Sequence, residues 1–272
     1  MKSNSFIAKP ESLALMRRFA GIANLYGAEG LAKLNNAHVC IIGVGGVGSW
    51  VVESLARSAV GEMTLIDMDV VSESNINRQL LAVTETIGKD KVAVLKERVH
   101  QINPDCKVTT HDEFISRDNL DLLLKSNMDF IIDCIDDFRL KAALIHYCKQ
   151  KKYNVLTIGA AGGQTNPSKI RQTDLSVTQH DALLARTRKL LRQDYHFPRN
   201  PKRSFSIPCV YSDEQPVYPD GAGGLSQQRP INNDDEQTMS ALSCAGGLGS
   251  ITHVTGTFAF YASAYVLNRL VK

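Results

Sequence analysis

A glycine-rich turn constrains the fold of this chain more than any other stretch of its sequence. An apolar run, Val39 to Ile42, leads into the turn, and apolar positions recur at helical spacing after Ser49. A second short apolar run, Met63 to Asp67, ends in a carboxylate. The turn itself holds Gly43, Gly45, Gly46 and Gly48. Strand, glycine loop, helix, strand and acid in this order are typical of nucleotide-binding folds, where backbone amides approach phosphate and the acid binds ribose hydroxyls.

The segments after this loop alternate between helix and strand. Helices are predicted at about 88–102, 120–124 and 141–149, and strands at 107–111, 130–135 and 154–158. Such alternation favours an α/β fold with a doubly wound, Rossmann-like and mostly parallel sheet. Residues 11–34 predict two short helices separated at Gly27, and therefore an N-terminal helical extension.

The pattern changes after residue 160, and we expect a single domain with an added C-terminal part. Its predicted parts are N-terminal helices at 1–36, a nucleotide-binding core at 37–160 and a helix and strand extension at 161–272. Residues 218–238 are rich in Pro, Gly, Asn and Asp and predict a mobile loop. Residues 244–267 are nearly uncharged, but their Ser, Thr and His side chains favour a buried helix over a membrane span or peripheral membrane contact.

Composition excludes several classes of protein. The chain is 43% hydrophobic and 22% charged with a formal net charge of +3, which is ordinary for a globular protein and compatible with an RNA or nucleotide partner. Its six cysteines form no C-x-x-C pair, which argues against a structural zinc site. The N-terminus lacks the continuous apolar stretch of a secretory signal, so we expect a cytoplasmic protein.

Charged residues beyond the glycine loop predict the chemistry. Asp69 follows Asp67, Arg78 lies in the segment SNINRQ, and Lys91 begins the next helix. A later strand ends near Asp133, Asp136 and Asp137. Cations on separate loops would neutralise a triphosphate while a carboxylate oxygen attacks the α-phosphorus, and Asp136 would hold Mg²⁺. A nicotinamide-binding module, the competing interpretation, needs none of these groups.

A basic segment extends from Asp181 to Arg203. Its cations could form a solvated helix face with a charged loop, or an electrostatic footprint for nucleic-acid phosphates, and both interpretations stay open from the sequence. The candidate nucleic-acid contacts are Arg186, Arg188, Lys189, Arg192, Arg199, Lys202 and Arg203.

In combination, these motifs resemble the E1-like adenylating enzymes of the ThiF, MoeB and HesA type. The match comprises the GxGGxGS loop, the acids at 67 and 69, the N-x-N-R-Q segment, Lys91 and the D-x-x-D at 133–136. The resemblance implies ATP and Mg²⁺ as cofactors. It implies Arg78, Lys91 and Asp136 as catalytic residues, with Asp136 as the metal ligand. The implied nucleotide-binding set is Gly43, Gly45, Gly46, Gly48, Ser49, Asp67, Asp69, Asn75, Asn77, Arg78, Gln79 and Lys91.

One branch of that family is similar over nearly the whole chain, including the segments RRFAGIANLYG, PCVYSDEQPVYP and SCAGGLGSITHVTGTFAF. This branch dehydrates threonylcarbamoyladenosine in tRNA, adenylating its carboxylate and then closing a ring. The resemblance therefore implies a tRNA with this nucleoside as the partner, and a homodimer. The sequence leaves open whether a sulfur-transfer partner, SufE-like or a cysteine desulfurase, also docks.

Departures from the family leave questions open. Where the family has an N-terminal arginine that reaches the partner subunit's site, this chain has Gly21, so that role would pass to Arg17 or Arg18. The alternative function is adenylation of the C-terminal carboxylate of a small sulfur-carrier protein. Activators of such carriers usually have C-x-x-C zinc pairs, which this sequence lacks.

Overall fold

One sheet organises the part of the chain that the structure, a computed structural model, describes: residues 10–228 and 248–272, with only the backbone for 10–16. In these residues the sheet has seven strands in the order β3-β2-β1-β4-β5-β7-β6. They are β1 (His38–Ile42), β2 (Glu62–Ile66), β3 (Lys107–His111), β4 (Phe130–Asp133), β5 (Val155–Ile158), β6 (Ile170–Asp174) and β7 (Pro208–Ser212). Only β6 runs antiparallel to its neighbour within this described sheet. The predicted mostly parallel, Rossmann-like fold is confirmed.

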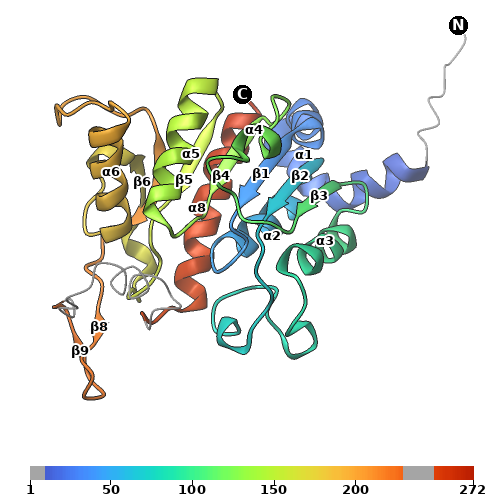
Figure 1. The fold of residues 1–272 in the computed structure, drawn as a ribbon. Helices are drawn as coiled ribbons and strands as arrows, with labels where there is room; N and C mark the ends of the chain where they lie inside the picture. Colours follow the sequence, from blue (N-terminus) through green and yellow to red (C-terminus); the bar gives the residue numbers. More distant parts are fainter. Residues whose placement is uncertain (1–9, 229–247) are drawn as a thin grey trace, which may run out of the picture.

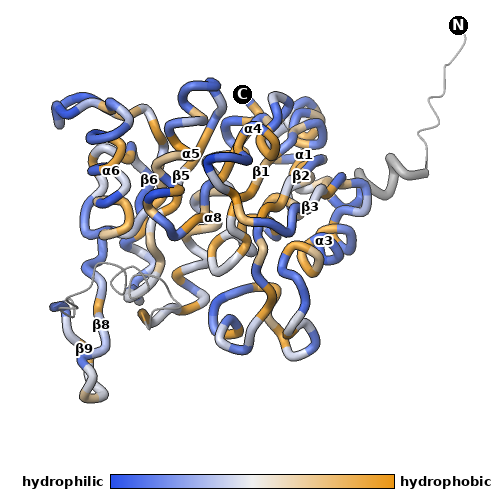
Figure 2. The backbone as a smooth tube through the Cα atoms, in the orientation of Figure 1, coloured by the Kyte–Doolittle hydropathy of each residue, from blue (hydrophilic) through white to orange (hydrophobic). Residues whose placement is uncertain are grey.

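Helices cover both faces of the sheet, so the molecule has three layers (Figure 1). On one face lie α1 (Pro10–Asn36), α2 (Gly48–Arg57), α3 (Lys91–Ile102) and α8 (Thr252–Leu270), and on the other α4 (Leu120–Leu123), α5 (Phe138–Lys151) and α6 (Ala182–Asp194). Strand β1 shows why: Val39 and Ile41 join the core of the first face, and Cys40 and Ile42 that of the second. Figure 2 shows the hydrophobic residues concentrated along these central strands.

The strand order reverses between β1 and β4. The chain runs outward from β1 to β2 and β3, then returns to place β4 and β5 on the other side of β1. Ligands of such sheets bind at this reversal, outside the carboxyl ends of the strands. Here the glycine loop follows β1 at that edge. A Cβ on Gly48 would lie 1.9 Å from the Gly43 carbonyl oxygen, so the close turn between strand and helix requires glycine.

Several predicted boundaries shift for local reasons. Helix α1 is interrupted at Gly27 (φ 75°), as expected, and also at Phe19 (φ −118°). Helix α5 begins at Phe138 rather than 141, because the Asp137 carboxylate accepts a hydrogen bond from the Leu140 amide (2.7 Å) and caps the helix. The strand predicted at 130–135 ends at Asp133, which leaves the next residues free to turn over the sheet edge.

The C-terminal part extends the same sheet. Strand β7 pairs with β5, and α8 packs against α2 with a buried side that includes Val254, Phe258 and Val266. Within 218–228 the structure has an antiparallel pair, β8 (Tyr218–Pro219) and β9 (Leu225–Ser226), which projects from the body in Figure 1. The rest of the predicted mobile loop, 229–238, and Cys244 lie outside the described residues. None of the described helices is long and apolar enough to cross a membrane.

Candidate active site

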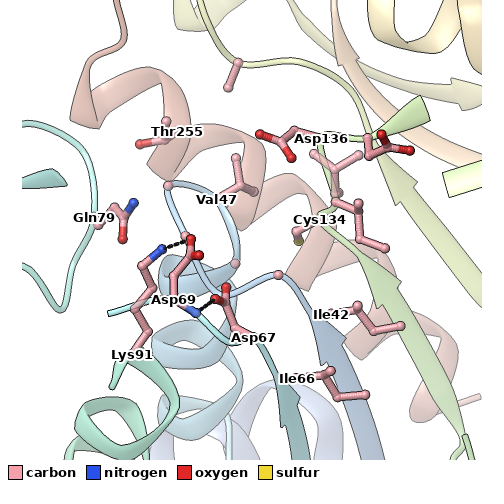
Figure 3. A pocket seen from close by; sticks show the side chains of 18 of the residues that line it. Ile42, Val47, Ile66, Asp67, Asp69, Gln79, Lys91, Cys134, Asp136 and Thr255 are labelled. Carbon is pink, nitrogen blue, oxygen red and sulfur yellow. Dashed lines mark hydrogen bonds and ion pairs between the residues drawn. The ribbon is translucent and has the colours of Figure 1, made fainter. Parts of the chain in front are cut away.

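A cavity of about 370 Å³ opens at the carboxyl edge of the sheet, where the strand order reverses. Its walls come from the loops that follow β1, β2, β3, β4 and β5, from the segment between β2 and α3, and from Leu183 of α6 and Thr255 of α8. Figure 3 shows the glycine loop in the middle of this view, with Asp69 and Lys91 on one side and Asp136 on the other. Residues from distant parts of the sequence thus enclose one space of the size of a nucleotide site.

Asp67 follows the end of β2 and supports two segments of the cavity wall. Its Oδ2 accepts a hydrogen bond from the Val44 amide (2.7 Å), and its Oδ1 accepts one from the Asp69 amide (2.9 Å). Burial raises the pKa of Asp67 above its ordinary value, although the charge of Lys91 and the two amide hydrogen bonds partly offset this. The carboxylate is therefore held rigidly beside the glycine loop.

Lys91 is the first residue of α3 and is only 4% exposed. Its Nζ lies 2.7 Å from Oδ2 of Asp69, whose side chain is 59% exposed. A buried ammonium needs a partner of opposite charge, and Asp69 supplies it. The pair places a positive charge at the cavity wall, where a phosphate would compete with Asp69 for it.

Arg78 lies on the cavity wall, on a loop that two helices fix in place. Its own Nη1 donates to the Ser74 carbonyl (2.6 Å) and to Oδ1 of Asn77 (2.9 Å). Its backbone carbonyl accepts hydrogen bonds from Nε1 of Trp50 on α2 (3.1 Å) and from Oγ1 of Thr255 on α8 (3.2 Å). Because Trp50 and Thr255 hold the backbone, the guanidinium is attached to a fixed point.

Gln79 lines the cavity and has an unusual buried polar group. The residue is 7% exposed, and its Oε1 finds no hydrogen-bond partner among the described residues. Buried amide oxygens are rarely left unpaired in proteins. This oxygen has almost no accessible surface, so a bound ligand could donate to it only after the side chain turns. Asn75 beside it is also on the wall, with its Oδ1 accepting from the Ser72 amide (3.2 Å).

The carboxylates at the end of β4 and after it have different environments. Asp133 is fully buried, and its Oδ2 lies 2.9 Å from Nζ of the equally buried Lys141. Thr157 donates to the same oxygen (2.7 Å), and the Ile135 amide donates to Oδ1 (3.1 Å). Asp133 therefore acts inside the core, whereas Asp136 is exposed at the cavity and free to meet a cation.

Two residues of the predicted nucleotide-binding set do not line the cavity. Ser49 is fully buried, and its Oγ accepts a hydrogen bond from the Leu80 amide (3.2 Å). The side-chain amide of Asn77 donates to the Ser250 carbonyl (2.8 Å), and the backbone carbonyl of Asn77 accepts from Oγ1 of Thr252 (2.6 Å). Both side chains hold the loop that carries Arg78, so their place in the structure is next to the site and not in its wall.

Arg18 and the cysteines occupy structural positions within this chain, and Arg17 is exposed. Nη1 of Arg18 donates to the Ile102 carbonyl (3.1 Å) at the C-terminal end of α3. Cys134 lines the cavity, but burial raises the pKa of its thiol to about 12, so it is protonated at neutral pH. Burial also raises the pKa of Cys209 far above its ordinary range.

The predicted nucleic-acid residues divide into two groups. Three arginines of α6 are packed against other side chains. Arg186 lies over the Phe138 ring, Arg188 donates a hydrogen bond to Oγ1 of Thr178, and Arg192 lies over the Phe205 ring. The exposed members are Lys189, Arg199, Lys202 and Arg203. Helix α6 begins beside the cavity with Leu183, and the loop after it enters β7, which is parallel to β5. That loop, 195–207, therefore lies at the amino edge of the sheet, opposite the cavity.

Some residues in the wall or directly behind it gave no signal in the sequence. Trp50 and Thr255 look like ordinary helix positions, and only the fold brings them to Arg78. Phe114 is 66% exposed on the wall directly after β3, where an exposed aromatic next to a strand end could have been noticed. Leu183 of α6 reaches the wall from a segment interpreted by its charge alone.

Comparison with known proteins agrees with this geometry. The model of the ThiF family matches residues 17–267. The tRNA threonylcarbamoyladenosine dehydratase of Haemophilus influenzae is 50% identical over 256 residues, 94% of each chain. That of Escherichia coli K12 is 41% identical over 258 residues, 95% of each chain.

Solved structures agree as well. The E. coli tRNA N6-threonylcarbamoyladenosine dehydratase, TcdA, in complex with ATP has a TM-score of 0.82 and 40% identity, covering 94% of this chain and 95% of that one. A structure described as TcdA (CsdL) has a TM-score of 0.86 over 97% of each chain. With a family model that matches almost its entire length and full-length relatives at this level of identity, the chain belongs to the ThiF family of E1-like adenylating enzymes, as its motifs predict.

Proposed function

We propose that this protein dehydrates threonylcarbamoyladenosine in tRNA by ATP-dependent adenylation of the nucleoside's carboxylate. One observation carries the proposal: a single cavity brings the glycine loop, Asp67, Arg78, Lys91 and Asp136 together, in a chain similar over its length to named dehydratases of this kind. Its relatives include a dehydratase solved in complex with ATP and another structure of it with AMP.

The cavity offers a distinct place for each part of ATP. The glycine loop and the start of α2 would receive the phosphates, because the glycines allow close approach and the positive end of the helix lies there. Asp67 would accept the ribose hydroxyls. The apolar wall formed by Met68, Phe114 and Ile135 would contact the adenine ring.

The reaction then proceeds in two balanced steps. A carboxylate oxygen of the threonyl group attacks the α-phosphorus, and the bond to pyrophosphate breaks. The carbamoyl group of the same nucleoside next attacks the activated acyl carbon, AMP leaves with the former carboxylate oxygen, and a proton is lost as the ring closes. Both reacting groups belong to one nucleoside, so the second step gains from proximity.

Arg78 and Lys91 would stabilise the charge that builds up on the phosphates during the first step. Lys91 must then exchange Asp69 for phosphate oxygens, which is feasible because the Asp69 side chain is largely exposed to water. Arg78 would turn from the Ser74 carbonyl toward the phosphates while Trp50 and Thr255 keep its backbone in place.

The residues present fit Mg²⁺ at Asp136. An exposed carboxylate at the wall, with oxygens of a triphosphate, is the usual ligand set of this ion. Bound there, the ion would neutralise phosphate charge and help pyrophosphate to leave. Asp133 would not bind it, because Lys141 and Thr157 already occupy its buried oxygens.

Other parts of the proposal concern the assembly. A homodimer is supported by the exposed apolar side chains Phe260 (52%) and Tyr261 (44%) of α8, and the mass of the protein in solution tests it. A cytoplasmic location follows from a tRNA substrate. A sulfur-transfer partner, SufE-like or a cysteine desulfurase, remains a prediction from the family resemblance.

The decisive experiment measures the mass of the nucleoside after incubation of the protein with ATP, Mg²⁺ and tRNA that carries threonylcarbamoyladenosine. We expect a product lighter by one water molecule, formed only when ATP is present. An unchanged nucleoside with correctly folded protein would contradict the proposal.

The carrier-protein alternative is weaker, because a molybdopterin-synthase adenylyltransferase of Salmonella typhimurium is 32% identical over only 49% of this chain. It predicts ATP–pyrophosphate exchange that depends on a small carrier protein and not on tRNA. A nicotinamide-binding module would instead bind NAD more tightly than ATP.

A further inference from the structure

A second cavity, of about 250 Å³, lies at the opposite edge of the sheet from the nucleotide site. Its walls include the residues just before or at the start of β4, β5 and β7, so it opens at the amino ends of these parallel strands. The C-terminal turn of α5 and the last turns of α8 complete it. Nothing in the proposed adenylation uses this region.

The charge of the second cavity is positive. Lys149 and Lys152 come from the end of α5, and Arg269 comes from the end of α8. None of the described residues that line it is acidic. Cations at helix C-termini commonly serve only to offset the helix dipole, so charge alone does not establish a ligand site.

Aromatic rings give the second cavity a further property. Tyr153 and Tyr265 line it, and the Arg269 guanidinium lies 5.9 Å from the centre of the Tyr265 ring. Lys149 is held in place, since its Nζ donates to the Phe205 carbonyl (2.5 Å). Proteins often bind unpaired nucleotides with neighbouring cations and aromatic rings. The cations bind phosphates, and the rings stack on bases.

The backbone of this cavity is also unusual. Lys152 (φ 60°) and Ser206 (φ 57°) both line it in the left-handed conformation, which non-glycine residues rarely adopt. At Lys152 this conformation ends α5, where the Lys152 amide donates to the Cys148 and Lys149 carbonyls. The left-handed residues therefore set the shape of the wall at the end of α5 and before β7.

The second cavity continues into the exposed part of the predicted nucleic-acid segment. Ser206 and Ile207 of its wall end the loop that carries Arg199, Lys202 and Arg203, all of them exposed. The loop and the helix ends therefore present cations from three separate segments of the sequence on one edge of the molecule. This edge is remote from the ATP cavity, so it cannot bind the nucleoside that reacts there.

We propose that this basic edge, defined by Lys149, Lys152, Arg269 and the 199–203 loop, binds a second, unpaired segment of the tRNA while the modified nucleoside occupies the ATP cavity. Phosphates would contact Lys152 and Arg269, and a base would stack on Tyr153. The inference rests on the proposed function for the identity of the RNA. It adds a contact that holds the substrate without taking part in the chemistry.

The test compares tRNA binding by the full-length wild type and the double variant Lys152→Asn/Arg269→Gln. The control Lys89→Gln/Lys107→Gln removes the same charge from two exposed lysines, one before α3 and one on β3, at the far end of the sheet from β7. Asparagine is chosen because it tolerates the left-handed conformation of Lys152. Fluorescence anisotropy with labelled tRNA at several salt concentrations gives the dissociation constants, and binding of a fluorescent ATP analogue checks the other cavity.

We expect the double variant to bind tRNA about tenfold more weakly. Its affinity should also depend less on salt. In a plot of log affinity against log salt concentration, the slope should be smaller in magnitude by about one for each phosphate that the variant no longer neutralises. ATP affinity and the control variant should match the wild type, and saturating tRNA should restore turnover. If the double variant does not fold, Lys152→Asn and Tyr153→Leu separately test the same prediction by smaller decreases in affinity.

Two results would overturn the inference. One is unchanged tRNA affinity in the folded variants. The other concerns vesicles of anionic phosphatidylglycerol. If the wild type binds these vesicles and the double variant does not, while both bind tRNA equally, the edge would be assigned to a membrane surface. Failure of the proposed function is a separate result, because it appears as an unchanged nucleoside mass in the wild type whether or not the basic edge binds tRNA.

Discussion

The two edges of the sheet carry charge in different ways. At the carboxyl edge, cations pair with carboxylates, as in Lys91 with Asp69 and Lys141 with Asp133, and Asp136 is exposed at the cavity. At the amino edge, Lys152, Arg199 and Arg269 are exposed, and the second cavity there has no acidic wall residue among those described. The first arrangement suits chemistry that needs fixed geometry, and the second suits attraction of a large polyanion.

The largest effect should come from removing the buried ion pair beneath the carboxyl edge. Lys141→Met leaves the Asp133 carboxylate buried without its counter-ion, so we expect the free energy of unfolding to fall by about 3–5 kcal/mol. Denaturation by urea measures this change.

The same helix supplies the control. Lys151 pairs with Asp121 at 3.0 Å, a separation close to the 2.9 Å of Lys141 and Asp133, but with side chains 48% and 75% exposed. Lys151→Met should leave stability nearly unchanged, because exposed ion pairs contribute little. Equal effects of the two substitutions would show that burial does not distinguish these pairs.

The next largest effect concerns the reaction itself. Arg78→Ala and Asp136→Ala should each lower turnover by about a hundredfold to a thousandfold, because each removes charge stabilisation that matters in the transition state. Both residues lie on loops at the cavity, so thermal unfolding should stay close to the wild type. Asp118→Ala, another exposed aspartate, is the control. Near-normal turnover in either variant would remove that residue from the mechanism.

The carboxyl edge was largely predictable from the sequence, and the amino edge was not. The glycine loop, Asp67, Arg78, Lys91 and Asp136 form ordered motifs, and all of them line one cavity. Parallel strands bring their carboxyl ends to one edge, so residues that follow successive strands must meet. Local spacing therefore contains the information that this site needs.

Lys152 and Arg269 show why the rest escaped prediction. They are 117 positions apart in the numbering and meet only because α5 and α8 both end at the amino edge. The basic segment was identified from composition, but its division into packed and exposed cations depends on tertiary contacts such as that of Arg192 with Phe205. Likewise, no periodicity distinguishes Asp133, which is buried, from Asp136, which is exposed.

A smaller effect should follow from loosening the backbone that carries Arg78. Trp50→Phe and Thr255→Val each remove one hydrogen bond to the Arg78 carbonyl, which is worth about 0.5–1.5 kcal/mol, so kcat/KM should fall about threefold to tenfold. In an Arg78→Ala background neither should matter further, because coupled residues are not additive.

Helix α8 again offers a matched control. Oγ1 of Thr257 donates within the helix to the His253 carbonyl (2.7 Å) and does not line the cavity, so Thr257→Val should leave kcat/KM unchanged. A decrease equal to that of Thr255→Val would mean that the helix as a whole is sensitive. In that case the two hydrogen bonds would not be the cause.

The smallest effect at neutral pH concerns Asp67. Burial raises the pKa of this carboxyl in the folded protein. The contribution of Asp67 to stability is therefore present below the pKa that it has in the unfolded chain, and it is lost as the pH rises through the pKa that it has in the folded protein.

The contact of Asp67 with the ribose depends on pH in the opposite sense, because hydroxyl donors need the ionised carboxylate as acceptor. ATP affinity should therefore fall on acidification at a higher pH than for an ordinary aspartate. The ratio of affinities for ATP and its 2′,3′-dideoxy analogue isolates this contact, since both carry the same titrating phosphates. Asp67→Asn should make the ratio independent of pH, and the salt dependence of tRNA binding at the basic edge should not change.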